Sequence, residues 1–197
     1  MNKSTLALAV SLAALASEAS AAGFIEDSKA SIGLRNFYYD LNTKNTANNN
    51  GEAREWGQGF IFNYASGFTQ GTVGFGVDAI GLLGVKLDSG GRAGKAGRDR
   101  TPGQLFPLDS NGSAVDDYSK AGVTAKLRVS KTEARIGTLQ PKLPVVTFND
   151  GRLLPQTFEG GQITSSEIGG LTLTAGQLES TKTRSSTDDI ALRIAGA

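Results

Sequence analysis

The segment GTVGFGVDAIGLLGVKLD, residues 71–88, decides the fold class of this chain. Its odd-numbered positions from Val73 to Leu87 are all apolar or small, whereas its even-numbered positions are mostly glycine, polar or charged. Only Ile80 and Leu82 interrupt the polar set. This period of two predicts one long β-strand with an apolar face and a polar face.

The length and the glycine content of this strand favour a membrane-spanning barrel. Strands of soluble domains usually run about five or six residues, whereas a strand of an outer-membrane barrel needs roughly 9–11 residues within the lipid and can extend beyond it. A face that carries glycine and charge is a poor wall for a packed core. It suits a water-filled lumen better.

The same alternation predicts further strands on both sides of this segment, and their connections alternate between long and short. Long polar loops and short turns, such as a minimal turn at 131–132, are typical of a barrel with extracellular loops and periplasmic turns. A soluble sandwich follows no such rule. We therefore expect an all-β fold, an antiparallel transmembrane β-barrel, with strands near 29–41, 56–65, 118–130, 133–139, 162–168 and 171–178, and one more that begins at Ile190.

The composition excludes several classes of protein. Cysteine and histidine are both absent, so the chain has no disulfide framework, no Ser-His-Asp triad and no ordinary zinc or haem site, and we expect no cofactor. A net charge of +1 indicates no particular partner. An exported hydrolase would depend on carboxylates alone, and Asp78 and Glu133 lie on different predicted strands with no spacing that joins them.

The first residues have the pattern of a cleaved secretory signal peptide. Lys3 provides the positive charge, an apolar core covers 6–16, and Ala19-Ser20-Ala21 provides the small residues before the cleavage site. The apolar core is shorter than the roughly 20 residues that a membrane-spanning helix needs. We therefore predict a signal peptide at 1–21 and a mature β-barrel portion at 22–197.

Several stretches together resemble the OprD family of substrate-specific outer-membrane porins. They cover nearly all of the predicted mature chain in order, and the longest of them is the most specific. The stretches are GFIEDS (23–28), LRNFYY (34–39), SGFTQGTVGFGVDAIGLLGVKLD (66–88), DDYSKAG (116–122) and GRLLPQTFEGGQITSSE (151–167).

This resemblance implies a monomeric eighteen-stranded barrel in the outer membrane, with a basic lumen narrowed by an inward-folded third loop. Family members pass small water-soluble solutes, often carboxylates: amino acids, aromatic acids and, in some cases, carbapenems. The alternation predicts only seven to eight strands here. We therefore interpret the chain as an N-terminal, truncated part of such a porin, which would need the missing half to close a pore.

The predicted polar strand faces supply candidate solute-contacting residues. If the apolar faces point to lipid, the lumen receives Arg35, Asp78, Lys126, Arg128, Glu133, Arg135 and Arg193. Guanidinium and ammonium groups in a row offer an anion successive shallow sites. The alternative is that they are solvated and paired with Asp78, Glu133 or residues of the missing half.

The resemblance also places the third loop at 141–161, with Arg152 near the narrowest point, which makes Arg152 the best single candidate. The alternative is that this arginine caps the turn at Asp150-Gly151.

The basic stretch GGRAGKAGRDR lacks the spacing of a phosphate-binding loop, so we expect no nucleic-acid partner. We expect this stretch to form an external loop that is solvated or contacts lipopolysaccharide. The alternative to a porin, in a different class, is a secreted or surface-attached β-rich binding protein that uses the same polar face.

Overall fold

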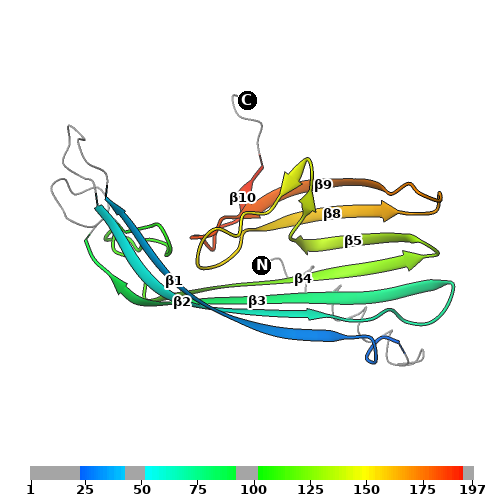
Figure 1. The fold of residues 1–197 in the computed structure, drawn as a ribbon, viewed down its shortest axis with the longest axis horizontal. Coiled ribbons are helices and arrows are strands. Elements are labelled where there is room, and N and C mark those ends of the chain that lie inside the picture. Colours follow the sequence, from blue (N-terminus) through cyan, green and yellow to red (C-terminus); the bar gives the residue numbers. More distant parts are fainter. Residues whose placement is uncertain (1–22, 43–51, 92–101, 193–197) are drawn as a thin grey trace.

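A computed structural model describes residues 23–42, 52–91 and 102–192. Within them, eight strands form one antiparallel sheet in the order β1-β2-β3-β4-β5-β8-β9-β10, and β6 pairs with β7 in a small separate hairpin (Figure 1). The edge strands β1 and β10 do not pair with each other, so the curved sheet is open. The strands are β1 (Lys29–Asn42), β2 (Glu52–Ala65), β3 (Val73–Ser89), β4 (Asp117–Val129), β5 (Thr132–Leu139), β6 (Lys142–Leu143), β7 (Val146–Thr147), β8 (Thr157–Ser165), β9 (Leu173–Lys182) and β10 (Ile190–Ala191).

The two ends of the sheet differ as the sequence predicts. The turns that follow β2, β4 and β8 lie at one end, on the right in Figure 1, and are short. The connections that follow β1, β3 and β5 leave from the opposite end and are longer. The antiparallel fold is therefore confirmed, and the alternation of long and short connections holds as far as β9. The connection from β9 to β10, residues 183–189, is no longer than the turns after β2 and β8. No helix among the described residues is long and apolar enough to cross a membrane.

Several strand boundaries were predicted wrongly. β2 begins at Glu52, not at residue 56, because polar residues continue the ladder with β1 as far as the pair Asn42 and Glu52. β8 begins at Thr157 and ends at Ser165, because a bulge between Glu159 and Gly160 masks its alternation. β9 continues to residue 182 through polar residues. The turn between β4 and β5 occupies residues 130–131, one position before the predicted turn.

The two faces of β3 follow the predicted alternation. Val73, Phe75 and Leu83 are exposed on the outer face, whereas Gly74, Gly76 and Gly84 are buried on the concave inner face. The outer face carries a continuous apolar surface across neighbouring strands, for example Ile32 and Phe62. An outward apolar face is what contact with lipid requires.

The hydrophobic core lies on the concave face, where two connections fold over the sheet. It consists of Leu82, Leu105, Phe106, Ala114, Tyr118, Leu153 and Leu154. The two apolar exceptions in the strand pattern are thereby explained, because Leu82 belongs to this core and Ile80 packs against it. The connection after β3, which the sequence indicated only as one of the long polar loops, therefore contains two fully buried apolar residues, Leu105 and Phe106.

Glycine at two positions of the concave face allows this close packing. A Cβ atom at Gly57 would lie 2.6 Å from Cζ of Phe106 and 2.7 Å from Cδ2 of Leu153. A Cβ atom at Gly84 would lie 2.5 Å from Cε1 of Tyr118. The glycine-rich face therefore lets folded connections approach the wall closely.

Candidate solute-binding site

Residues 140–156, called the inward loop below, connect β5 to β8 and lie against the concave face. The β6–β7 hairpin forms part of this loop (Figure 1). Leu153 and Leu154 are fully buried in the core, and Nζ of Lys120 on β4 donates to the Pro155 carbonyl oxygen at 2.8 Å. The inward-folded loop expected at 141–161 is thus present up to Gln156. Residues 157–161 belong instead to β8, because they pair with β5 and β9.

Arg35, on β1, anchors the inward loop. Its Nη1 and Nη2 atoms donate to the Asp150 carboxylate at 2.7 and 3.0 Å. Nη1 also donates to the carbonyl oxygen of Arg152 at 2.8 Å. A bidentate pair of this kind fixes orientation as well as charge. The structure therefore places Arg35 in an internal ion pair on the concave face.

Arg152 lies in the inward loop, with its guanidinium stacked on the ring of Tyr39. The distance from Cζ to the ring centroid is 4.3 Å, and no ion pair to this side chain is present within the described residues. Oδ1 of Asn149 accepts the Gly151 N–H at 2.9 Å, so an asparagine caps the turn at this position. The guanidinium is positioned by an aromatic ring and keeps its charge uncompensated.

Lys126 and Arg135 lie in a network of charged groups nearer the turn end of the sheet. Nζ of Lys126 is 2.6 Å from Oδ1 of Asp78 and donates to the Ser66 carbonyl oxygen at 2.8 Å. Nε of Arg135 pairs with Glu133 at 2.5 Å, and its Nη1 lies 4.0 Å from Asp78. The pairing with Asp78 and Glu133 that the sequence left open is therefore present for both cations.

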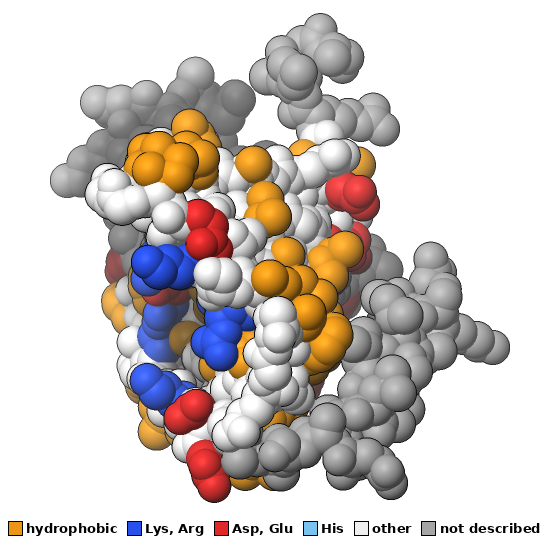
Figure 2. Space-filling view, turned by 90° about the vertical axis from the view of Figure 1, so that its right-hand side faces the viewer, with side chains coloured by type: hydrophobic (Ala, Val, Ile, Leu, Met, Phe, Trp, Pro, Cys, Tyr) orange, Lys and Arg blue, Asp and Glu red, His pale blue; other side chains and the backbone are white. Residues whose placement is uncertain are grey.

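Arg128, the next basic residue toward the turn after β4, is exposed. Its Cζ atom lies 4.2 Å from the ring centroid of Phe68, in the β2–β3 turn. Nζ of Lys126 approaches the same ring at 4.9 Å. Among the described residues, no carboxylate forms an ion pair with Arg128. Figure 2, which faces this end of the sheet, shows basic side chains gathered together beside a few acidic ones.

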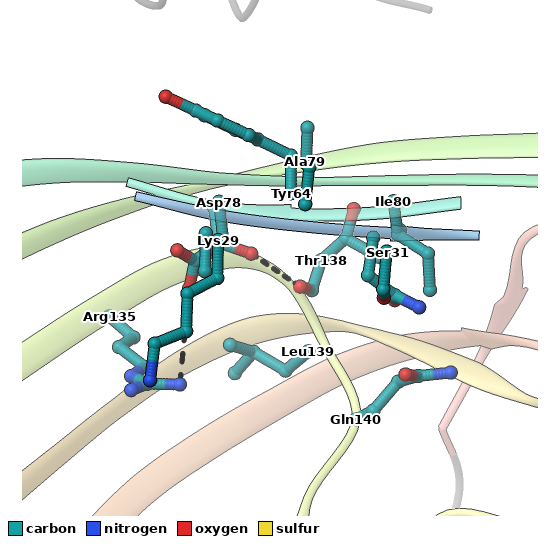
Figure 3. A pocket seen from close by; sticks show the side chains of 14 residues that line it. Lys29, Ser31, Tyr64, Asp78, Ala79, Ile80, Arg135, Thr138, Leu139 and Gln140 are labelled. Atoms are coloured by element: carbon teal, nitrogen blue, oxygen red, sulfur yellow. Dashed lines mark hydrogen bonds and ion pairs between the residues drawn. The ribbon is translucent and has the colours of Figure 1, made fainter. Parts of the chain in front are cut away.

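The concave face contains a hollow of about 490 Å³ lined by β1 to β5 and the start of the inward loop. In Figure 3, Asp78 and Arg135 point toward one another at one side of it, whereas Tyr64 points away from it. Hydroxyl and amide groups of Thr138 and Gln140 complete the lining. The hollow offers a solute a cation, an anion and neutral hydrogen-bonding groups within one space.

Lys120 and Glu55 are among the charged residues of the concave face that were missed from the sequence. Lys120 is buried, and its Nζ atom bridges Pro155 and Thr183 through their carbonyl oxygens. Its place in the alternation of β4, six residues before Lys126, could have revealed it. Glu55 is fully buried as well, but it precedes the predicted start of β2, so no pattern pointed to it.

Comparison with known proteins identifies the family. The family model described as "outer membrane porin, OprD family" matches residues 22–197. The chain belongs to the OprD family. This family consists of non-enzymatic channels of the outer membrane, so the hydrolase interpretation is excluded, and the match favours a channel over a secreted binding protein.

Relatives within the OprD family share sequence and fold with this chain. It is 46% identical over 180 residues to the porin-like protein GalP of Pseudomonas putida, covering 91% of this chain and 41% of that protein. The crystal structure of OccK8 (OprE) from Pseudomonas aeruginosa is 59% identical with a TM-score of 0.75, covering 89% of this chain and 39% of that one. The structure of Pseudomonas aeruginosa OpdK with vanillate is 45% identical with a TM-score of 0.75, covering 85% and 40%.

The chain spans about 40% of the length of these OprD-family relatives. The predicted signal peptide, the basic stretch at 92–100 and Arg193 lie outside the described residues. Within the described part of the chain, no group of three or more carboxylates is arranged to hold a metal ion.

Proposed function

We propose that this chain supplies part of the wall and the constricting inward loop of an outer-membrane channel for small carboxylate-bearing solutes. The observation that carries the proposal is the Arg152 guanidinium, held by Tyr39 on a loop inside the sheet and not paired with a carboxylate among the described residues. An anion that reaches it meets a permanent positive charge with free donors. Passage then needs attraction that is strong enough for entry and weak enough for release.

Arg152 and Arg128 are the proposed successive anion contacts. Both guanidinium groups are stacked on aromatic rings, at 4.3 and 4.2 Å, so each is oriented without losing its charge. Arg35, Lys126 and Arg135 have carboxylate partners within the wall or the loop. We assign these three residues to the shape and local field of the path, and the two stacked arginines to direct solute contact.

The proposed solutes are monocarboxylates with a planar or polar body, including amino acids and aromatic acids. OpdK, a relative with 45% identity, was solved with vanillate, an aromatic carboxylate. The hollow beside Asp78 and Arg135 carries charge of both signs, which suits a solute that has an ammonium group as well as a carboxylate. The apolar outer face would contact the acyl chains of the outer membrane.

Channel recordings in planar lipid bilayers, made with the complete channel of which this chain forms a part, test the role of Arg152. Two charges 4 Å apart interact by about 1 kcal/mol in water, which corresponds to a change in anion occupancy of about fivefold. We expect Arg152→Gln to shift the reversal potential toward cation selectivity and to weaken the block of chloride current by benzoate by about that factor.

Lys142→Gln provides the matched control, because it removes one positive charge from the same loop, where Nζ lies 5.3 Å from the Phe148 ring centroid. This variant should leave benzoate block nearly unchanged. Equal effects of the two substitutions would contradict a specific contact at Arg152 and would indicate a diffuse field. Unchanged block in both variants would contradict the carboxylate path itself.

A further inference from the structure

Residues 102–116, the second half of the β3–β4 connection, fold onto the concave face and touch the inward loop. We call them the buttress segment. Leu105 and Phe106 of this segment are fully buried in one cluster with Leu153 and Leu154. The inward loop therefore packs against a second connection as well as against the wall.

A single carboxylate holds the start of the buttress segment. Oε2 of Glu55 on β2 accepts the N–H groups of Gln104 and Leu105, both at 2.6 Å. Oε1 accepts the N–H of Gly103 at 3.2 Å and the Ser89 hydroxyl at 3.3 Å. Glu55 is fully buried, and no Lys or Arg pairs with it among the described residues, so backbone N–H groups compensate its charge.

Tyr118, on β4, holds the other side of the same segment. Its hydroxyl lies 2.9 Å from the carbonyl oxygen of Leu105. Its ring meets the Phe106 ring edge to face, with centroids 5.9 Å apart. Phe106 is thereby fixed where it and Leu153 both lie over Gly57. Because Arg152 directly precedes Leu153, fixing Leu153 also fixes the backbone from which the Arg152 side chain extends.

We infer that the buttress segment locks the inward loop and that Glu55 is a positioning residue for Arg152, acting through Leu105, Phe106 and Leu153. The buried Glu55 carboxylate accepts hydrogen bonds from four donors. A glutamine amide in its place would direct its own NH₂ group toward some of these donors, and those hydrogen bonds would be lost. The loss should loosen residues 103–106 first and the inward loop second. The consequence for solute selectivity rests on the proposed function, whereas the packing claim does not.

Trypsin cleavage after Arg152 in the detergent-folded protein tests the packing claim, because Leu153 is buried and its bond is protected. The cut is measured by mass spectrometry. We expect Glu55→Gln to speed it about tenfold, because one charged hydrogen bond is lost. Amide hydrogen exchange at residues 103–106 should rise in the same sample. Glu179→Gln, an exposed glutamate of β9, should change neither measurement.

Gly57→Ala provides a second variant that leaves the carboxylate intact, since its Cβ atom would displace Phe106 and Leu153 directly. It should also speed the Arg152 cut. If Glu55→Gln speeds exchange at 103–106 but not the cut after Arg152, the buttress segment does not hold the inward loop in place. If exchange at 103–106 is unchanged, the Glu55 carboxylate does not hold the buttress segment. In bilayers, Glu55→Gln should weaken benzoate block only when Arg152 is present. Additive effects of the two substitutions would overturn the positioning role, even if Arg152 itself proves to bind anions.

Discussion

The Arg35 guanidinium on β1 makes a bidentate pair with the Asp150 carboxylate of the inward loop, although the two residues are 115 positions apart in the sequence. The same guanidinium holds the Arg152 carbonyl oxygen. One side chain of the wall therefore sets both the position of the loop and the direction of the chain at the proposed anion contact.

Reversing this pair tests whether its charges hold the loop. Asp150→Arg should place two guanidinium groups together and release the loop, with about threefold faster amide hydrogen exchange at residues 149–154, because a partly exposed pair contributes about 1 kcal/mol or less. The double variant Arg35→Asp with Asp150→Arg should restore the slow rate. Asp117→Asn, an exposed position on β4, is the control. A double variant as labile as the single one would show that shape, and not charge, holds the loop.

The Lys126–Asp78 pair should contribute strongly to stability because Lys126 is buried. Lys126→Met removes the partner of a partly buried carboxylate. We expect the free energy of unfolding to fall by about 2 kcal/mol, measured in urea and detergent micelles by the fluorescence of Trp56. The loss is smaller than for a fully buried pair because Arg135 lies 4.0 Å from Asp78 and still compensates part of its charge.

Removing both charges separates the pair from simple packing. Lys126→Met combined with Asp78→Asn should recover most of the stability, because no unpaired charge is then left. If the double variant is less stable than Lys126→Met alone, the ion pair is not the source of the loss.

Glycine on the inner face of β3 should tolerate a methyl group far less well than glycine on the outer face. Gly84→Ala should destabilise the folded chain by about 1–3 kcal/mol, because the new Cβ atom meets the Tyr118 ring at 2.5 Å in a packed core. Gly81→Ala on the same strand meets Phe62 only at ordinary distances, 3.7 Å or more. Heat-dependent gel mobility should change for the first variant and not the second. The reverse order would contradict the assignment of the two faces.

Glu167, in the turn after β8, should make this end of the sheet sensitive to acid. The backbone N–H of Lys131 donates to its carboxylate at 2.7 Å, and the Ser130 hydroxyl donates at 3.1 Å. These hydrogen bonds, the backbone one first, lower the pKa of Glu167 below the ordinary value for glutamate. A lowered folded-state pKa means that the stabilisation is present above the unfolded-state pKa and is lost as the pH falls through the folded-state pKa.

Hydrogen exchange at residues 130–132 measures this effect. In the wild-type protein, exchange corrected for intrinsic rates should rise as the pH is lowered below the ordinary range of a glutamate. In Glu167→Gln it should already be raised at neutral pH and should change little with acid. Identical pH profiles of the two proteins would contradict the assignment.

Much of the fold follows from local patterns that lipid imposes. Apolar and polar residues alternate along each strand because one face contacts lipid and the other does not. The alternation of Val73 and Phe75 with Gly74 and Gly76 was therefore enough to predict the strand and its two faces. The boundaries of β2 and β8 were missed where this constraint ends, in the polar ladder before Trp56 and at the bulge beside Gly160.

The sequence by itself determined most of the strands, their faces, the family resemblance and the concave-face position of several basic side chains. Only the tertiary structure decided which of the basic residues are paired. Arg35, Lys126 and Arg128 look alike in the alternation, yet the first two have carboxylate partners and the third stacks on Phe68. Ion pairs between distant segments depend on how the loops fold back, and folding back depends on buried contacts such as Leu153 over Gly57 and Glu55 at Leu105. The alternation of residues along a strand does not predict such contacts, because each of them joins residues that come together only when the chain folds.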